Sequence, residues 1–270
     1  DIKVFTHKGF VSTPMISFGV LQYQCAQGIV ITASHNPPSY NGFKLKGAHG
    51  GPTPPHQIAE VENLIPDAVV PISGDLSDFE KKGLLVYVDL EKDYEDYIRS
   101  KFDIVSMNQS PFKMAYDAMF GAGQRVMKNL FPKALHLHCE VNPSFNGISP
   151  EPLHKNLLEL SAVIQNTPEL KFGLANDGDA DRIALYDEDG KYIDSHHIIL
   201  LLIHYLHKYK NLTGKVAIAA STTLRVNKLC ALYGLPCEVT PIGFKYISEI
   251  MMHEDVLVGG EESGGISVKG

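Results

Sequence analysis

Long hydrophobic runs are missing from this chain of 270 residues. The longest strongly apolar run, Ile198 to Ile203, is far too short to span a bilayer. The chain also does not open with a basic segment followed by an apolar stretch, the pattern of a secretion signal. We therefore expect a protein without a membrane partner, and the cytoplasm is its expected location.

Excess basic charge and the metal-binding spacings of cysteine and histidine are also absent. The formal net charge is −7 and no basic stripe stands out, which argues against a nucleic-acid groove. Scattered cysteines without CxxC spacing, as found here, are typical of a reduced intracellular chain. The 12 histidines show no HExxH or similar ligand spacing.

Strand-like and helix-like segments alternate along the chain, which predicts the α/β class. Strands are expected at 2–5, 28–31, 114–119, 172–175, 183–186, 191–193, 215–220, 237–240 and 256–258, and helices at 15–25, 56–64, 93–102, 124–130, 150–165, 196–209, 224–233 and 244–252. The first two strands and the helix between them are expected to form a βαβ-type start.

We expect three units with a linker at 66–82 and a second boundary near Asp194. Their predicted ranges are 1–80, 90–193 and 194–270, the third truncated. Because the chain begins on a strand-like segment and stops after a glycine-rich loop, a fragment is expected.

A polar turn after the strand at 28–31 contains the candidate reacting group, Ser34. The run from Thr32 to Lys44 is rich in the turn formers Asn, Pro and Gly, so it is expected to be a loop at a strand end. A serine hydroxyl needs a base, a metal or prior modification to react. Adjacent residues on extended backbone point in opposite directions, so we do not expect His35 to serve as its base. The alternative is a surface turn without chemistry.

Three carboxylates alternate in the acidic loop between the strands at 172–175 and 183–186: Asp177, Asp179 and Asp181. Such clustering repels itself unless a cation neutralises it, and oxygen ligands favour Mg²⁺ or Ca²⁺. An EF-hand is rejected because Arg182 replaces its glycine and a strand follows. The alternative is a solvated turn without an ion. Three ligands are few for Mg²⁺, and a phosphorylated Ser34 would supply another.

Two glycine-rich segments follow other predicted strands. The segment 121–123 is interpreted as a tight strand-to-helix turn rather than a phosphate site. In the segment 259–265, Glu261 and Ser263 offer groups that bind sugar hydroxyls, and a flexible turn is the alternative.

Two basic residues near these motifs are candidates for phosphate binding. Lys44 and Arg182 are able to meet phosphate oxygens, and Lys44 is also able to move a proton. Solvation at the surface is the alternative for Lys44.

Three motifs in this order resemble the α-D-phosphohexomutase family, which includes phosphoglucomutases and phosphomannomutases. They are TASHNPPSYNGFK (32–44), DGDADR (177–182) and GEESGG (260–265). The ordered trio is very specific, and the resemblance covers nearly the whole chain. It implies successive mixed-sheet α/β domains packed around a shared cleft.

The resemblance implies a role for each candidate residue. Ser34 resembles the phosphoserine, which binds one Mg²⁺ together with Asp177, Asp179 and Asp181. His35 and Lys44 belong to the catalytic motif, with Lys44 as general acid or base. Arg182 would lie beside the phosphate, and Glu261 and Ser263 would bind sugar hydroxyls. Lys245, in the segment 240–245, lies in a looser match to another active-site loop.

The implied reaction moves phosphate between the 1- and 6-positions of a hexose. The phosphoserine phosphorylates a hexose phosphate, the resulting hexose 1,6-bisphosphate reorients, and the other phosphate returns to Ser34. The expected reaction is the conversion of glucose 1-phosphate to glucose 6-phosphate, because the GEESGG motif resembles glucose-type members of the family more closely than mannose-type members. Phosphomannomutase specificity is the alternative.

This sequence departs from the family pattern at both ends. The start of the first domain and the fourth domain, with its RxSGTEP-like phosphate-binding loop, are expected to be missing. We therefore expect the isolated chain to bind Mg²⁺ but to turn over sugar phosphate poorly. The rival interpretations are a non-catalytic metal- and sugar-phosphate-binding module and a phosphatase. The phosphatase is disfavoured because no DxDx[TV] nucleophile precedes the acidic loop.

Overall fold

The first unit contains two small sheets and the helices between them. The computed structural model describes residues 2–68 and 74–269. The elements of this unit are β1 (Val4–Thr6), α1 (Thr13–Gln22), β2 (Gln27–Ile31), β3 (Phe43–Gly47), α2 (Pro55–Asn63), α3 (Leu76–Lys81) and β4 (Leu85–Tyr87). Strand β1 pairs in parallel with β4, whereas β2 pairs antiparallel with β3.

One prediction for this unit is wrong. The chain does not start with a βαβ unit, because β1 and β2 belong to different sheets. After β2, the polar turn at 32–42 reverses the chain, and β3 pairs with β2 instead. The predicted linker at 66–82 contains helix α3, where the Asp75 side chain accepts a hydrogen bond from Ser77 N and caps the helix. Residues 69–73 of that linker lie outside the described residues.

The second unit is built on a five-stranded mixed sheet. Its elements are α4 (Leu90–Lys101), α5 (Ile104–Gln109), β5 (Lys113–Asp117), α6 (Gln124–Leu130), β6 (Leu135–Leu137), α7 (Leu158–Gln165), β7 (Leu170–Asn176), β8 (Ile183–Tyr186) and β9 (Tyr192–Ile193). The strand order is β6-β5-β7-β8-β9. Strands β5, β6 and β7 run parallel, and β8 and β9 complete an antiparallel edge.

Helix α7 is shorter than predicted. The helix expected from residue 150 begins only at Leu158, and a single 3-10 turn precedes it (His154–Asn156). Pro150 and Pro152 lack the N–H groups of a helix interior, which explains the loop. Another 3-10 turn, Phe145–Gly147, precedes this loop.

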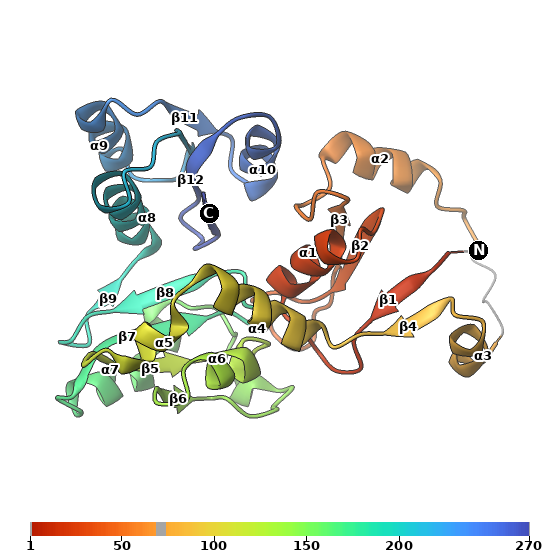
Figure 1. Cartoon of the computed structure of the whole chain (residues 1–270), viewed down its shortest axis with the longest axis horizontal. Coiled ribbons are helices and arrows are strands. Elements are labelled where there is room, and N and C mark those ends of the chain that lie inside the picture. Colours follow the sequence, from red (N-terminus) through yellow and green to blue (C-terminus); the bar gives the residue numbers. More distant parts are fainter. Residues whose placement is uncertain (1, 69–73, 270) are drawn as a thin grey trace.

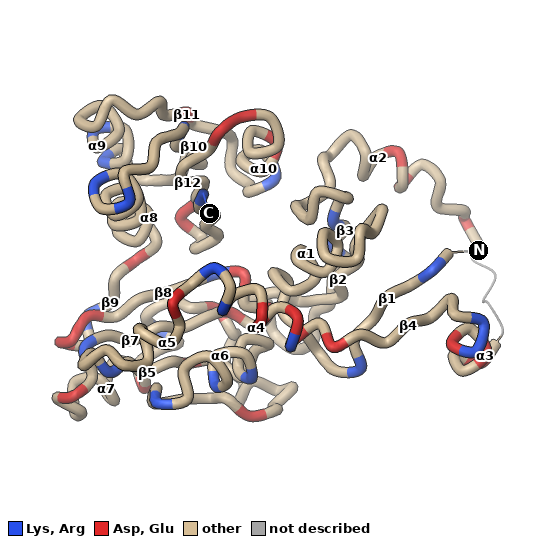
Figure 2. Tube along the Cα trace, in the orientation of Figure 1, with Lys and Arg blue, Asp and Glu red and all other residues tan. Residues whose placement is uncertain are grey.

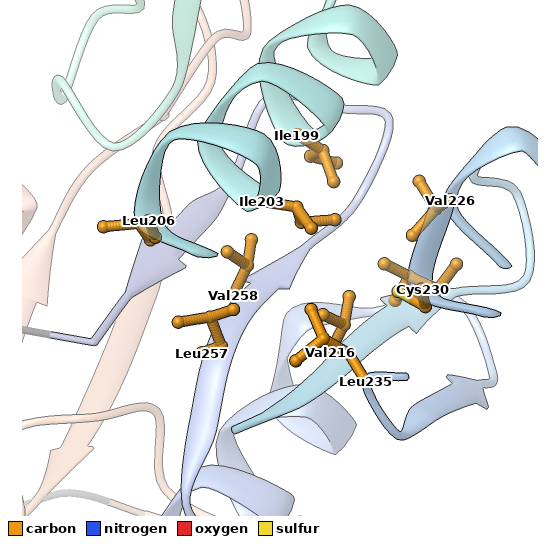
Figure 3. Close-up of a cluster of buried hydrophobic side chains, with 10 residues drawn as sticks. Ile199, Ile203, Leu206, Val216, Val226, Cys230, Leu235, Leu257 and Val258 are labelled. Carbon is orange, nitrogen blue, oxygen red and sulfur yellow. The ribbon is translucent and has the colours of Figure 1, made fainter. Parts of the chain in front are cut away.

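The third unit contains a four-stranded sheet in the order β11-β10-β12-β13. Its elements are α8 (Ser195–His204), a π-helical turn (Tyr205–Tyr209), β10 (Lys215–Ala219), α9 (Arg225–Tyr233), β11 (Cys237–Thr240), α10 (Phe244–His253), β12 (Val256–Gly260) and β13 (Ile266–Val268). Side chains of α8 and α9 pack on the β10–β12 face in an apolar core (Figure 3). This burial fixes the strand ends that carry the glycine-rich loop.

The three units follow one another in space as in the sequence (Figure 1). The third unit, in blue, lies above the second, and the first, in red and orange, lies beside both. A shared apolar cluster joins α1 to α4 and α6 through Met15, Leu90 and Val126. Lys and Arg are interspersed with Asp and Glu along the trace (Figure 2). Among the described residues, no helix combines the length and apolar content that a bilayer span requires.

Candidate active site

Ser34 lies in a tight polar turn directly after β2. Its backbone is in the left-handed region, with φ 53°, which a serine rarely adopts without support. Ser34 N donates to Thr32 Oγ1 at 2.8 Å, and Thr32 N donates to the Gly42 carbonyl at 3.0 Å. These hydrogen bonds hold the turn and present the serine side chain to the second unit.

The relative orientation of Ser34 and His35 differs from the prediction. His35 Nδ1 lies 3.3 Å from Ser34 Oγ, so the two side chains do not point apart. The prediction assumed an extended backbone, and the left-handed conformation of Ser34 removes that assumption. On its other side, His35 Nε2 is 3.9 Å from Glu151 Oε1. This distance exceeds a hydrogen bond, so no assembled hydrolase triad is present among these residues.

The acidic loop, which connects β7 to β8, contacts the serine turn. Asp177 is fully buried, and its Oδ1 accepts from Asp181 N at 3.0 Å and Arg182 N at 3.1 Å. Its other oxygen, Oδ2, accepts from Ser34 Oγ at 3.3 Å. The two segments are 143 positions apart in sequence, and the fold brings them into contact.

Gly178 makes this contact sterically feasible. A Cβ atom at this position would lie 2.5 Å from the Ser34 carbonyl oxygen, closer than real contacts allow. The turn at 121–123 supports the loop from behind, where Ala122 N donates to the Gly178 carbonyl at 2.9 Å. This packing favours the tight-turn interpretation of the segment.

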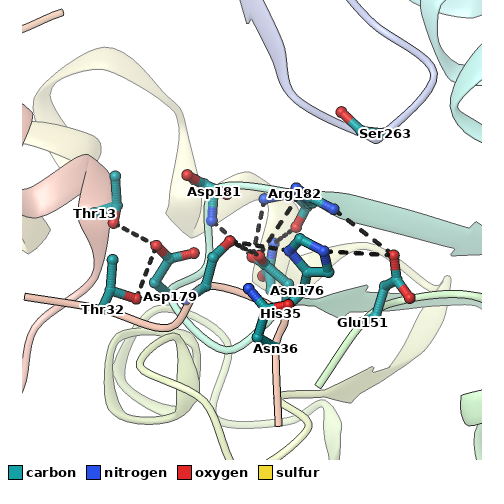
Figure 4. A network of polar contacts seen from close by, with 12 residues as sticks. Thr13, Thr32, His35, Asn36, Glu151, Asn176, Asp179, Asp181, Arg182 and Ser263 are labelled. Atoms are coloured by element: carbon teal, nitrogen blue, oxygen red, sulfur yellow. Dashed lines mark hydrogen bonds and ion pairs between the residues drawn. The ribbon is translucent and has the colours of Figure 1, made fainter. Parts of the chain in front are cut away.

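Asp179 gathers polar groups from the first unit. Its Oδ2 accepts from Thr13 Oγ1 at 2.8 Å and Thr32 Oγ1 at 3.1 Å (Figure 4). The same oxygen accepts from Lys44 Nζ at 3.0 Å. Its Oδ1 is buried without a hydrogen-bond partner in the described part of the chain. Thr13 and Thr32 were not predicted as site residues. Thr32 opens the serine motif and offered some signal, whereas Thr13, at the start of α1, offered none.

The carboxylate cluster fits a hard cation. One oxygen from each of Asp177, Asp179 and Asp181 lies within 4.8 Å of the others. Burial, followed by the charges of Asp181 and Asp179, raises the pKa of Asp177 well above its usual range. The partnerless Asp179 Oδ1 is the kind of buried oxygen that a bound cation would satisfy. All these donors are oxygens, which suits Mg²⁺.

Two basic side chains balance part of this negative charge. Burial would lower the pKa of Lys44, but Asp181 and Asp179 outweigh burial and raise it. Lys44 Nζ is 3.4 Å from Asp181 Oδ2. Arg182 lies 3.9 Å from both Asp177 Oδ2 and Glu151 Oε1, a distance compatible with ion pairing but too long for a hydrogen bond. Glu151 was missed at the sequence level because its Pro-rich loop was predicted to be helical.

A cleft of about 930 Å³ between the three units collects most of the predicted residues. Ser34, Lys44, Asp181, Arg182, Lys245 and Glu261 all line it. Ser263 lies apart from the Ser34 cluster in Figure 4, and its hydroxyl donates to Glu261 Oε1 at 2.7 Å. The Ile183 N–H donates to the Gly264 carbonyl at 3.3 Å, which links the glycine-rich loop to the acidic loop.

Burial and a neighbouring cation also affect His35. Burial, and then the charge of Arg182, lowers the pKa of His35 despite the acidic residues nearby. A neutral imidazole beside Ser34 Oγ is able to donate or accept a hydrogen bond with that oxygen, depending on its tautomer, and adds no positive charge to the site.

The structure combines three α/β units around a cleft with a serine hydroxyl that contacts a carboxylate cluster, an arrangement that suits an α/β enzyme with a site for a hard cation. Models for phosphoglucomutase/phosphomannomutase α/β/α domains I, II and III match residues 1–69, 92–190 and 194–270. The chain therefore belongs to the α-D-phosphohexomutase family, as the motifs predicted. The domain boundaries themselves stay a prediction.

Individual relatives carry different substrate names. The chain is 30% identical over 270 residues to a phosphoglucosamine mutase of Caldicellulosiruptor bescii, covering 96% of this chain and 57% of the relative. It is also 30% identical to a phosphoglucomutase of Neisseria meningitidis, covering 97% and 55%. The chain thus spans about half the length of these curated relatives.

A solved structure shares the fold closely. The crystal structure of a putative phosphomannomutase from Thermus thermophilus superposes with a TM-score of 0.89 at 32% identity. The match covers 98% of this chain and 60% of that one.

Proposed function

We propose that the protein is a phosphohexomutase, which moves a phosphoryl group reversibly between the 1- and 6-positions of a hexose through a phosphoserine at Ser34. The observation that carries the proposal is the contact of Ser34 Oγ with Asp177 Oδ2, at 3.3 Å, in a cleft wide enough for a sugar phosphate. The chain spans only about half the length of its curated relatives, so we propose this activity for the whole protein.

Ser34, Lys44 and Arg182 have different roles in the proposed phosphoryl transfer. A sugar hydroxyl attacks the phosphorus of phosphorylated Ser34, and the bond between phosphorus and Ser34 Oγ breaks as the new bond forms. The sugar hydroxyl loses its proton in this step and Ser34 Oγ gains one, so that the leaving serine ends as a neutral hydroxyl. Lys44, held protonated by Asp179 and Asp181, stabilises negative charge on the transferred group and is placed to supply a proton. Arg182 adds a second positive charge beside Asp177.

Asp177, Asp179 and Asp181, with the phosphate on Ser34, would hold Mg²⁺, which withdraws electron density from the phosphoryl group when bound. Glu261 lines the cleft and would accept hydrogen bonds from sugar hydroxyls. After the first transfer the ligand is a hexose 1,6-bisphosphate. It reorients, returns its other phosphate to Ser34 Oγ and leaves as the isomeric monophosphate. The same bisphosphate would activate the unphosphorylated chain.

Glucose phosphates are the proposed substrates. The GEESGG loop supports this choice. The similar proteins are named for different hexoses, namely glucose, glucosamine and mannose, so the choice is to be tested with each hexose phosphate. The cytoplasmic location stays a prediction.

Intact mass spectrometry of the chain before and after incubation with glucose 1,6-bisphosphate and Mg²⁺ tests the proposal. We expect a gain of one phosphoryl group that Ser34→Ala abolishes. An unchanged mass, or a gain that persists in Ser34→Ala, would reject the phosphoserine role.

A further inference from the structure

A second cavity, of about 220 Å³, lies at the carboxyl ends of β5 and β6. Among the described residues, it shares no lining residue with the cleft. The chain places β6 on one side of β5 and then returns to place β7 on the other side, with all three strands parallel. In open α/β sheets, ligands bind in the crevice that such a change of side opens at the carboxyl ends of the strands. The topology of the second unit therefore puts this cavity where a ligand site is expected.

Unusual backbone conformations are concentrated in the lining of this cavity. Of the nine non-glycine residues with positive φ in the described part of the chain, five line it, with φ between 47° and 59°: Met119, Phe120, His138, Phe145 and Asn146. Asparagine tolerates this left-handed conformation, but it is sterically costly for the other four. Strain of this kind persists where the surrounding structure imposes it, and it clusters at functional sites and ligand clamps.

A buried carboxylate orients an imidazole in the same lining. Asp117 is only 1% exposed and accepts a hydrogen bond from Met119 N at 2.8 Å. Both of its carboxylate oxygens lie 3.0 Å from His138 Nδ1. The other ring nitrogen, His138 Nε2, is 3.3 Å from Glu159 Oε2, on a side chain that is 63% exposed. Because an exposed side chain is able to move aside, His138 Nε2 is a polar atom that a ligand is able to reach.

The remaining lining residues indicate an uncharged ligand with a ring. The apolar part of the wall is formed by Phe120, Phe145, Ile148, Pro150 and Leu158. Two acidic side chains, Asp117 and Glu159, are balanced by His138 and Lys155, so neither sign of charge is in excess. Asn146 adds a side-chain amide, which both donates and accepts hydrogen bonds. Apolar and aromatic walls with a few polar groups are typical of sites that bind small molecules and fix their orientation.

The loop at 145–151 connects this cavity to the active site. Pro150 lines the cavity, and its carbonyl accepts a hydrogen bond from Gly178 N in the acidic loop at 3.1 Å. The next residue, Glu151, places its Oε1 3.9 Å from His35 Nε2 (Figure 4). A ligand that shifts this loop would therefore change the surroundings of the reacting serine, which is the physical requirement for coupling two sites.

We propose that this cavity is an effector site that binds an uncharged planar ring carrying a hydrogen-bonding group, and that its occupancy changes the rate of Ser34 phosphorylation through the loop at 145–151. The ring would contact the aromatic wall, and its polar group would meet His138 Nε2. The binding goes beyond the proposed function, whereas its effect on Ser34 rests on that function.

Ligand-observed NMR titrations without sugar phosphate test the binding. Benzamide is the probe, because it combines a planar ring with a neutral amide. Cyclohexanecarboxamide keeps the amide on a puckered ring, and benzoate keeps the planar ring but is negatively charged. We expect saturable binding of benzamide with a Kd of about 1 mM, as suits a ligand of this size, and binding at least about fivefold weaker for the other two.

Phe145→Asn separates binding from folding. It removes part of the aromatic wall, while asparagine adopts the left-handed conformation more readily than phenylalanine, so the chain should stay folded. This variant should bind benzamide about tenfold more weakly than wild type. Ile148→Ala, at a wall residue that is 48% exposed, should weaken binding about threefold with little effect on folding. Phe112→Asn is the matched control, at a side chain that is 64% exposed outside this lining, and should bind as wild type does.

The rate of Ser34 phosphorylation by glucose 1,6-bisphosphate and Mg²⁺, measured by intact mass spectrometry, tests the coupling. Saturating benzamide should change this rate by about twofold or more in wild type and in Phe112→Asn. The same concentration should leave the rate of Phe145→Asn unchanged, as should an equal concentration of cyclohexanecarboxamide in wild type.

The outcomes distinguish the site from its effect. Absence of saturable benzamide binding to wild type, or wild-type affinity in both Phe145→Asn and Ile148→Ala, would overturn the site. An unchanged phosphorylation rate at saturating benzamide would overturn the coupling. Failure of wild type to become phosphorylated even without benzamide would overturn the proposed function and the coupling, whereas the binding titration decides on the site independently.

Discussion

Replacing Gly178 by alanine tests whether the contact between the serine turn and the acidic loop matters. A Cβ atom there would lie 2.5 Å from the Ser34 carbonyl oxygen, whereas real contacts of this kind stay beyond 3.0 Å. The serine turn must therefore retreat by about 0.5 Å, because a backbone atom cannot swing away as a side chain does.

The expected effect is larger on phosphoryl transfer than on stability. Overpacking of this kind costs about 1–3 kcal/mol of stability. A displacement of about 1 Å in a reacting group lowers rates about a hundredfold, so the smaller shift should slow Ser34 phosphorylation about tenfold or more. The assay is the rate of phosphate gain from glucose 1,6-bisphosphate.

Gly9→Ala is the matched control. A Cβ at Gly9 would meet nothing closer than 3.7 Å, and the backbone of Gly9 lies outside the left-handed region. It should be phosphorylated at the wild-type rate. Phosphorylation of Gly178→Ala at the wild-type rate would refute the argument that the two segments must touch.

The same contacts and one distant histidine give three further predictions. Saturating Mg²⁺, at about a hundredfold excess over Kd, should raise the melting temperature by about 5–10 °C, and Asp177→Asn should remove most of that rise; an equal rise in the variant would exclude Asp177 as a ligand. Without Mg²⁺, Lys44→Met should lose about 1 kcal/mol in urea denaturation, a value discounted because Lys44 is 38% exposed, and an unchanged midpoint would show that its pairs with Asp179 and Asp181 are negligible. The hydrogen bond to Asp117 outweighs burial and raises the pKa of His138, so the stabilisation that His138 gives is complete below the unfolded-state pKa of about 6.5 and is lost as pH rises through the higher folded-state pKa. His138→Gln should flatten the decline in stability above about pH 6.5, and an identical pH profile would contradict the assignment.

Sequence patterns predicted the elements that carry the motifs because those elements have strong local signals. The strands before and after the acidic loop are alternating apolar segments with buried faces, and both are confirmed as β7 and β8. The βαβ-type start failed because strand pairing depends on partners distant in sequence, here β4 for β1. The prediction of a helix from residue 150 was wrong because it relied on the spacing of apolar residues, whereas Pro150 and Pro152 prevent a helix there.

The site was predictable to the extent that its motifs carry their own chemistry. The carboxylates of the acidic loop were found by their spacing, and the structure clusters them. The approach of His35 to Ser34 was not predictable, because a left-handed serine leaves no mark in the residue pattern. Thr13 and Glu151 join the site only through tertiary packing, so no local signal could have indicated them.

Transfer of labelled phosphate from Ser34 to a sugar tests the central claim most directly. The chain is first charged with radiolabelled phosphate at Ser34, freed of donor, and then mixed with glucose 1-phosphate and Mg²⁺. The account predicts that the label leaves the protein and appears in glucose 1,6-bisphosphate. Label that stays on the protein, or appears only as inorganic phosphate, would contradict it.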